Sequence, residues 1–254
     1  MNDKKDFIGV FDSGVGGISV LRQLKKILPN ERFLYYGDSA NAPYGSRTTA
    51  QVQQLTLTAV EKMMEFGLKA LVVACNTATS AAIRLLREKY PDFIIIGIEP
   101  ALKPAVQQFP SGTIGVMATP VTLRENKFLA LTERCGEGAE IIKIPAPGLV
   151  ELVEAGKADS EEALRYLTDL LAPCRSRLDA LVLGCTHYPL ALGNIRKVLG
   201  PRVVLLDGGE GTARETRRRL EKAGLLSDGT GEILWKNTGE NGEILQLCKQ
   251  LLEQ

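Results

Sequence analysis

The chain has 254 residues, 44% of them hydrophobic, which suits a globular protein with one large or two small domains. Its formal net charge of +1 argues against non-specific binding to nucleic acid or to an anionic membrane surface. The first residues have too short an apolar run for a signal peptide, and the longer apolar runs cannot span a bilayer, so we expect a cytoplasmic protein that acts on a small molecule.

Short apolar runs typical of buried strands alternate along the chain with longer segments of helical period. The expected strands, in chain order, are 7–11, 32–37, 70–74, 93–98, 113–118, 140–144, 180–184 and 202–207. Amphipathic helical segments lie between them, among them 16–28, 49–67, 78–90 and 160–174. After residue 207 we expect two further helices around an edge strand or loop at 231–237. The alternation predicts an α/β fold in which helices cover parallel sheets.

A weak internal repeat divides the chain into two similar units. The segment IGVFDSGV from Ile8 resembles IGVMATPV from Ile114, 106 residues later. The segment ALVVACNT from Ala70 resembles ALVLGCTH from Ala180, 110 residues later. We therefore predict two similar open parallel-sheet α/β domains related by a pseudo-repeat, with the active site in the cleft between them. The first domain is expected to comprise residues 1–98 and 208–254, and the second residues 99–207.

Two of the five cysteines, Cys75 and Cys185, end the third expected strand of each unit. Ligands bind at this edge of open α/β sheets, and the first and third strands of such a unit are commonly neighbours, so we expect Asp12 to lie beside Cys75. Residues typical of turns and helix caps follow both cysteines, and a helix N-terminus lowers the pKa of a thiol. The only histidine, His187, is either a structural residue or a partner that holds or relays the proton of Cys185.

The remaining cysteines are expected to be small buried residues of the core. They are Cys135, Cys174 and Cys248. The odd number of cysteines and the lack of a C-x-x-C pair suit free thiols in a reduced compartment, and they argue against a disulfide framework or a zinc site.

The segment DSGVGG, Asp12 to Gly17, follows an expected strand and opens a helix, as the dinucleotide-binding fingerprint does. Asp38 ends the next strand, about where an acid that binds ribose would lie. However, Ser19 stands where the third glycine belongs, and Asp12 would place a carboxylate near a pyrophosphate. The glycines equally allow the carboxylate of a small ligand to approach backbone N–H groups, with Ser13 adding a hydroxyl. Both interpretations of this loop stay open at this point.

The turn-rich segment DSANAPYGSR, residues 38–47, follows the second expected strand. It is either a plain connection between a strand and a helix or a loop that contributes to the site. In the second case, Tyr44 and the N–H group of Gly45 cover the same sheet edge as Asp12 and Cys75.

Four segments, FDSGVGG, GDSANAPYGSR, ACNTATS and GCTHYPL, resemble in order and spacing the signature segments of bacterial glutamate racemases, within the aspartate/glutamate racemase superfamily. The resemblance covers nearly the whole chain. It implies an isomerase that interconverts L- and D-glutamate for peptidoglycan synthesis, needs no cofactor or metal, and commonly forms a homodimer. Two positions depart from the family pattern: Asn41, where arginine is frequent, and Ala146, where many relatives carry a Cys-Pro pair.

The resemblance also implies roles for individual residues. Cys75 and Cys185 act on opposite faces of the substrate, because a single base that recaptures its own proton would tend to restore the original configuration. Asp12 then tunes Cys75 or holds the substrate ammonium group, and His187 tunes Cys185, with Glu154 as its partner. The implied substrate contacts are Asp12, Ser13, Tyr44, Gly45, Asn76, Thr77, Thr186 and His187, with Asp38 as a further supporting residue.

Three alternatives stay open. An aspartate or other amino-acid racemase would keep both cysteines and change the pocket for the side chain. A nucleotide-binding α/β protein would bind a dinucleotide without isomerising an amino acid. A thiol hydrolase built on Cys185 and His187 would form an acyl-enzyme.

Overall fold

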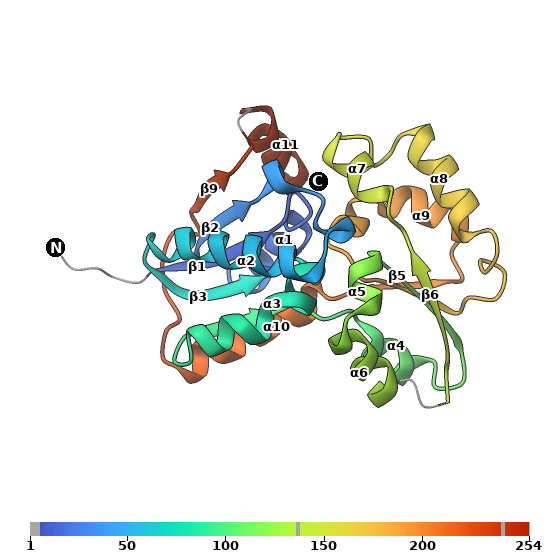
Figure 1. Cartoon of the computed structure of the whole chain (residues 1–254), viewed down its shortest axis with the longest axis horizontal. Helices are drawn as coiled ribbons and strands as arrows, with labels where there is room; N and C mark the ends of the chain where they lie inside the picture. Colours follow the sequence, from blue (N-terminus) through green and yellow to red (C-terminus); the bar gives the residue numbers. More distant parts are fainter. Residues whose placement is uncertain (1–5, 136–137, 240–241, 254) are drawn as a thin grey trace.

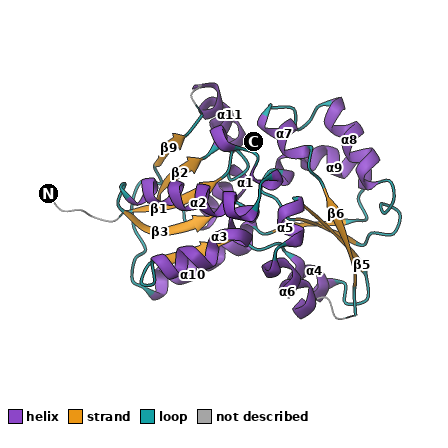
Figure 2. Ribbon diagram, viewed as in Figure 1, coloured by secondary structure: helices purple, strands orange, loops and turns teal. Residues whose placement is uncertain are grey.

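The strands form two separate parallel sheets, seen in orange in Figure 2. The computed structural model describes residues 6–135, 138–239 and 242–253. The first sheet has the order β4-β3-β1-β2-β9, with β1 (Phe7–Asp12), β2 (Arg32–Gly37), β3 (Leu68–Val73), β4 (Ile94–Gly97) and β9 (Ile233–Asn237). The second has the order β6-β5-β7-β8, with β5 (Thr113–Ala118), β6 (Glu140–Pro145), β7 (Ala180–Leu183) and β8 (Val204–Asp207). All eight predicted strands are present, and segment 231–237 is an edge strand.

Helices cover both sheets, and the last two elements of the chain return to the first sheet, where Figure 1 shows them in red beside the blue N-terminal strands. The helices that accompany the first sheet are α1 (Ile18–Ile27), α2 (Thr49–Met64), α3 (Asn76–Lys89), α10 (Gly209–Lys222) and α11 (Gly242–Glu253). Those that accompany the second sheet are α4 (Leu102–Gln108), α5 (Pro120–Arg124), α6 (Asn126–Cys135), α7 (Leu149–Glu154), α8 (Glu161–Leu171) and α9 (Leu192–Leu199). Three short 3₁₀ helices lie in loops: η1 (Ser39–Asn41), η2 (Tyr44–Ser46) and η3 (Tyr188–Ala191).

The two sheets confirm the internal repeat. Strands β4-β3-β1-β2 of the first sheet correspond in order to β8-β7-β5-β6 of the second. The register is also the same, because Ile8 pairs with Ala70 and Ile114 pairs with Ala180, the residues at which the repeated segments begin. Each sheet falls within one of the two predicted domains, whose residue limits stay a prediction.

Apolar burial explains why these segments form parallel sheets with helices on their faces. All six residues of β3 are buried, as expected for a strand covered on both faces. Helix α1 buries Ile18, Val20, Leu21 and Leu24 on one side, at the spacing of a helical stripe. In the part of the chain that the structure describes, no helix combines the length and the apolar character needed to cross a membrane.

Candidate active site

The two candidate cysteines lie at corresponding places in the two sheets. In each unit the residue before the cysteine donates its backbone N–H to the carbonyl of the penultimate residue of the first strand. These bonds run from Ala74 to Phe11 at 2.8 Å and from Gly184 to Met117 at 2.7 Å. Cys75 is 4% exposed and Cys185 7%, so both residues are buried. The repeat therefore anchors both cysteines at the carboxyl ends of central strands, where the site is expected from the sequence.

Cys75 is held in a position where it keeps its proton. It caps the N-terminus of α3, and its sulfur accepts the N–H of Ala78 at 3.4 Å. Its S–H donates to Ser13 Oγ at 3.5 Å. Burial, together with the negative charge of Asp12, raises the pKa of Cys75 to about 12, although the bonds to Ser13 and Ala78 act in the opposite direction. The helix N-terminus thus lowers this pKa as predicted, but burial outweighs it.

Cys185 differs from Cys75 in the backbone of the next few residues. An α-helix begins directly after Cys75, and its first bond joins the Thr79 N–H to the Cys75 carbonyl at 2.9 Å. The residue at the corresponding position after Cys185 is Pro189, which has no N–H to donate. The chain instead makes a tight turn, in which the Tyr188 N–H donates to the Cys185 carbonyl at 3.2 Å. The turn leads into the 3₁₀ helix η3, and α9 begins only at Leu192, so Cys185 does not cap an α-helix as Cys75 does.

His187 connects Cys185 to a carboxylate. Its Nδ1 lies 3.7 Å from Cys185 Sγ, and its Nε2 lies 2.5 Å from Glu154 Oε1. Burial by itself would lower the pKa of His187, but the hydrogen bonds to Cys185 and Glu154 raise it well above its ordinary value. The structure therefore brings the predicted pair His187 and Glu154 together and favours the imidazolium form. An imidazolium in this position can donate to the sulfur of Cys185.

Asp12 lies at the contact between the two units. Its carboxylate accepts the N–H of Gly14 at 3.1 Å and the hydroxyl of Thr186, from the second unit, at 3.0 Å. Strands β1 and β3 are neighbours, as predicted, and Asp12 is close enough to Cys75 for its charge to affect the thiol. Burial raises the pKa of Asp12 to about 6, and the positive charge of His187 opposes this rise.

We expect Asp12→Asn to raise the free energy of unfolding at pH 7 by about 2 to 3 kcal/mol, because the native pKa of about 6 exceeds the ordinary 3.8 by about two units. The folded protein binds this proton more tightly than the unfolded chain does, so the wild type loses stability as the pH rises from about 4 to about 6. An asparagine has no such dependence, and its amide oxygen can accept the N–H of Gly14 while its amide nitrogen donates to the hydroxyl oxygen of Thr186, which reverses the direction of that bond. Urea unfolding at several pH values checks this, and a gap between variant and wild type that stays constant from pH 4 to pH 7 would contradict it.

The loop after β2 reaches the second unit and is held by Asp38. The hydroxyl of Tyr44 donates to Asp38 Oδ2 at 2.6 Å, and that of Thr238 donates to Oδ1 at 2.7 Å. Burial and the bond to Asp38 raise the pKa of Tyr44. A Cβ atom at Gly45 would lie 2.7 Å from side-chain atoms of Thr119, so glycine is needed for this approach. The predicted residues Asp38, Tyr44 and Gly45 thus form one loop over the contact between the units.

A cluster of threonine hydroxyls joins Thr77 to the second unit and was not expected from the sequence. Thr77 Oγ1 lies 2.9 Å from Thr119 Oγ1 and 3.3 Å from Thr122 Oγ1, and all three residues are buried. The repeat offered a signal for this, because Thr119 follows β5 by one residue as Ser13 follows β1. Next to Thr77, the buried side-chain oxygen of Asn76 has no hydrogen-bond partner among the described residues.

The glycines of DSGVGG pack against the second unit. A Cβ atom at Gly14 would lie 1.8 Å from Glu154 Oε1, and one at Gly16 would lie 2.3 Å from His187 Nδ1. The backbone N–H of Val15 donates to Glu154 Oε1 at 2.8 Å. The carboxylate and the imidazole therefore fill the space in front of this loop, and this argues against the interpretation as a pyrophosphate site.

Comparison with known proteins agrees with the resemblance in the sequence. The profile of the Asp/Glu/Hydantoin racemase family matches residues 8–216. The chain belongs to this racemase family.

A glutamate racemase from Clostridium kluyveri is 50% identical over 251 residues, which cover 97% of this chain and 97% of that protein. A crystal structure of a glutamate racemase isoform from Bacillus anthracis matches with a TM-score of 0.88 and 34% identity over 98% of this chain and 94% of that one. A glutamate racemase from Francisella tularensis, solved in complex with D-glutamate, matches with a TM-score of 0.85 and 27% identity over 100% of this chain and 95% of that one.

The two positions that depart from the pattern of this racemase family form hydrogen bonds with residues around the two cysteines and not with the cysteines themselves. The side-chain amide of Asn41 donates to both carboxylate oxygens of Asp38, at 3.1 and 3.2 Å. Ala146 is fully buried, and its carbonyl accepts the hydroxyl of Tyr188 at 2.8 Å. Neither position contacts Cys75 or Cys185 in these interactions.

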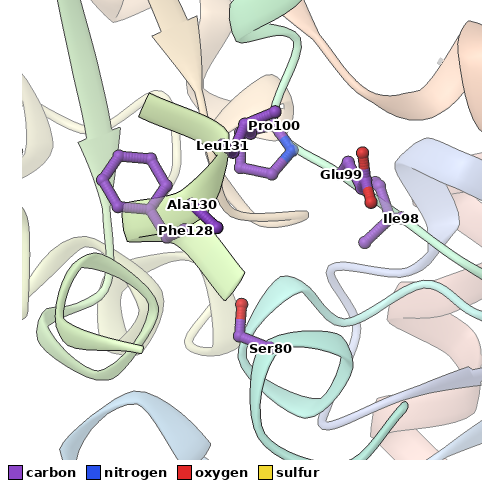
Figure 3. A pocket seen from close by; sticks show the side chains of 7 residues that line it. All are labelled: Ser80, Ile98, Glu99, Pro100, Phe128, Ala130 and Leu131. Atoms are coloured by element: carbon purple, nitrogen blue, oxygen red, sulfur yellow. The ribbon is translucent and has the colours of Figure 1, made fainter. Parts of the chain in front are cut away.

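The other cysteines and the small cavity of Figure 3 are not part of the predicted site, although burial and the charges of Glu154 and Asp12 raise the pKa of Cys248 to about 12. Cys174 and Cys248 are buried free thiols, and the side chain of Cys135 lies outside the described part of the chain. A cavity of about 160 Å³ lies where α6, α3 and the segment after β4 meet, and Figure 3 shows the side chains that line it. Its lining residues are Ser80, Ile98, Glu99, Pro100, Phe128, Ala130 and Leu131. None of the predicted site residues lines it. Among the described residues, no group of three or more histidine, cysteine, aspartate or glutamate side chains could hold a metal ion.

Proposed function

We propose that the protein interconverts L- and D-glutamate by transferring protons at Cα between Cys75 and Cys185. From L-glutamate, the Cys185 thiolate takes the Cα proton, and the electron pair of the broken C–H bond moves toward the carboxylate. The Cys75 thiol then gives its proton to the opposite face of Cα. One S–H bond forms and one breaks, so the turnover needs no oxidant or reductant. For D-glutamate the two sulfurs exchange roles.

The observation that carries this proposal is the difference between the partners of the two buried cysteines. Burial and the charge of Asp12 keep the proton on Cys75, whose pKa is about 12. Cys185 lies 3.7 Å from the imidazole that Glu154 holds. A two-base racemase needs one thiol and one thiolate at the start of each turnover. This arrangement supports Cys185 as the base that acts on L-glutamate, the direction that the family resemblance assigns to it.

Polar groups around the cysteines suit an amino-acid substrate with two carboxylates. The unpartnered amide oxygen of Asn76 is a buried acceptor, and leaving it unsatisfied costs about 1 to 3 kcal/mol. We propose that the substrate ammonium donates to Asn76 and to Asp12. The hydroxyls of Ser13 and Thr77 and the backbone N–H groups of Gly45 and Thr186 then bind the carboxylates, since the hydroxyl of Thr186 already donates to Asp12. The complex of the Francisella tularensis racemase with D-glutamate supports this class of ligand.

Further properties follow from the resemblance and belong to the same proposal. The product D-glutamate would serve peptidoglycan synthesis in the cytoplasm, and the protein would act without cofactor or metal as a homodimer. We infer no binding to nucleic acid or membrane, since the net charge of +1 provides no strong field for either.

The test is the incubation of purified protein with L-glutamate, followed by polarimetry without added pyridoxal phosphate or metal. We expect the optical rotation to fall to zero, because the enantiomers have equal free energy. L-aspartate under the same conditions should give a much slower change. Activity that disappears on dialysis against a chelator and returns with a metal ion would contradict the proposal, as would faster turnover of L-aspartate.

A further inference from the structure

Ser19 has a hydroxyl that the proposed mechanism does not use and that connects the two halves of the site. The residue lies in the first turn of α1, within the first unit. Its Oγ donates to the backbone carbonyl of Thr186, in the second unit, at 2.8 Å, and it also lies at donor distance, 2.9 Å, from the carbonyl of Gly16. The Thr186 carbonyl belongs to the peptide bond that links Thr186 to His187. Ser19 therefore reaches the backbone of the turn that carries the imidazole.

The turn after Cys185 depends on contacts from outside. In the first unit, α3 begins directly after Cys75, so helical hydrogen bonds order the residues that follow this cysteine. Pro189 prevents the same arrangement in the second unit, and the turn keeps one backbone bond to the Cys185 carbonyl, from Tyr188 at 3.2 Å. The next backbone bond runs from the Leu190 N–H to the His187 carbonyl at 3.0 Å, and neither of these two bonds engages the carbonyl of Thr186.

Two anchors come from the first unit, and both hold Thr186. Its hydroxyl donates to Asp12 Oδ1 at 3.0 Å, and its carbonyl accepts the hydroxyl of Ser19 at 2.8 Å. With the side chain and the carbonyl both bound, the peptide that follows has one orientation. This fixes where the ring of His187 leaves the chain, and Glu154, 2.5 Å from Nε2, holds the other side of the ring, so that Nδ1 faces Cys185. An alanine or glycine at position 19 would leave the Thr186 carbonyl without this donor.

We propose that Ser19 is a positioning residue, whose hydroxyl orients the Thr186–His187 peptide so that the imidazole stays against Cys185. The proposal extends the proposed racemase function, but the geometry that it describes can be measured without turnover. It also explains why a serine stands where the dinucleotide-binding fingerprint has its third glycine. A serine at position 19 donates a hydrogen bond from the first unit to the second, which a glycine could not do.

The first test compares the reactivity of the two thiols in Ser19→Ala and in the wild type. Iodoacetamide labels both cysteines, and peptide mass spectrometry gives the rate at each. A general opening of the structure would raise the labelling rate of both buried thiols, whereas displacement of the imidazole would change the labelling rate of Cys185 alone. The ratio of the two rates therefore isolates the effect of the imidazole. We expect the ratio of the Cys185 rate to the Cys75 rate to fall about fivefold, the effect of losing one hydrogen bond. Ser19→Thr, which keeps the hydroxyl, should restore the ratio.

Thr168→Val is the matched control, because it removes a hydroxyl that donates to the carbonyl of Leu164 at 2.8 Å within α8, away from the cysteines. The control should leave the ratio unchanged. An unchanged ratio in Ser19→Ala, or a ratio that falls equally in Thr168→Val, would overturn the positioning role. Because labelling needs no substrate, a protein that labels as expected but does not racemise glutamate would contradict the proposed function alone.

The second test uses turnover. Ser19→Ala should lower kcat from L-glutamate about fivefold and kcat from D-glutamate less, with Ser19→Thr close to the wild type. A purely structural role would lower the melting temperature without this difference between the two directions. The proposal would be overturned if Ser19→Ala lowered kcat equally in both directions and Ser19→Thr did not restore it.

Discussion

Replacement of either Cys75 or Cys185 by alanine is expected to lower the racemisation of glutamate about a thousandfold or more, because a positioned acid or base contributes about 10² to 10⁴ to a rate. Each direction of the reaction uses one sulfur as base and the other as acid, so both variants should lose both directions. The fold should persist, since alanine fits wherever a buried cysteine does and leaves a space of one sulfur atom. Circular dichroism and polarimetry on the same samples measure the two effects.

Exchange of the Cα proton with solvent distinguishes the roles of the two sulfurs more directly than turnover does, because exchange needs only one of the two bases. In D₂O, Cys75→Ala retains the base for L-glutamate and should still exchange the Cα proton of L-glutamate for deuterium, without inversion. Cys185→Ala should do the same for D-glutamate alone. Proton NMR of the Cα signal follows each case. If each variant exchanged the opposite enantiomer, the assignment of bases to enantiomers would be reversed, while the two-base mechanism would stand.

Cys174→Ser is the matched control for these variants. Cys174 is buried like the candidate bases, and its S–H donates to the carbonyl of Leu171 at 3.6 Å, a bond that a serine hydroxyl can also make. Its racemase activity should stay within about twofold of the wild type, as for an ordinary substitution away from the site. Near-normal racemisation in Cys75→Ala or Cys185→Ala would show that the two-base proposal is wrong.

His187→Asn should lower kcat from L-glutamate by about a hundredfold, within the range for loss of assisted proton transfer. The equilibrium constant between enantiomers equals one, so kcat/KM must fall equally in both directions. However, kcat and KM can change unequally, because the imidazole of His187 lies 3.7 Å from the sulfur of Cys185 and acts on that cysteine. We therefore expect a smaller loss of kcat from D-glutamate than from L-glutamate.

Asp12→Asn should show the opposite bias, because the charge of Asp12 acts on Cys75. Progress curves from each enantiomer, for wild type and both variants, give the four kcat values. Cα-deuterated substrate verifies that proton transfer limits the rate. Equal losses of kcat in both directions for both variants would contradict the assignment of one supporting residue to each cysteine, although the racemase proposal would survive.

The parallel strands were predictable because a strand buried on both faces is a short continuous apolar run. Every residue of β3 is buried, and the run ALVVA marks it in the sequence. Helix limits were less predictable, since caps decide them. The segment 49–67 contains α2, which ends at Met64, three residues earlier than expected. After Cys185, residues typical of turns and caps lead into a turn and a 3₁₀ helix instead of an α-helix, because Pro189 lacks the N–H that the first α-helical bond needs.

The site was predictable where the topology of the sheet decides proximity, and not where single side chains meet across the two units. That Asp12 lies near Cys75 follows from the adjacency of first and third strands. The bonds from Ser19 to Thr186 and from Val15 to Glu154 join residues more than 100 positions apart in sequence, and no local pattern indicates them. The threonine cluster at Thr77 joins residues 42 and 45 positions apart, and only the repeat, which places Thr119 as it places Ser13, gave a signal for it.

By itself, the sequence determined the pair of similar sheets and the two cysteines at their carboxyl edges, because apolar runs, their spacing and the repeat are properties of the chain in order. The tertiary structure alone decided the directions in which the pKa values of Cys75 and His187 shift. A helix N-terminus favours a thiolate at Cys75, yet burial beside Asp12 raises its pKa to about 12. For His187, bonds to Cys185 and Glu154 outweigh a burial that would otherwise make it neutral. The charge of each group depends on what packs around it at distances of a few ångströms, and only the folded chain specifies those neighbours.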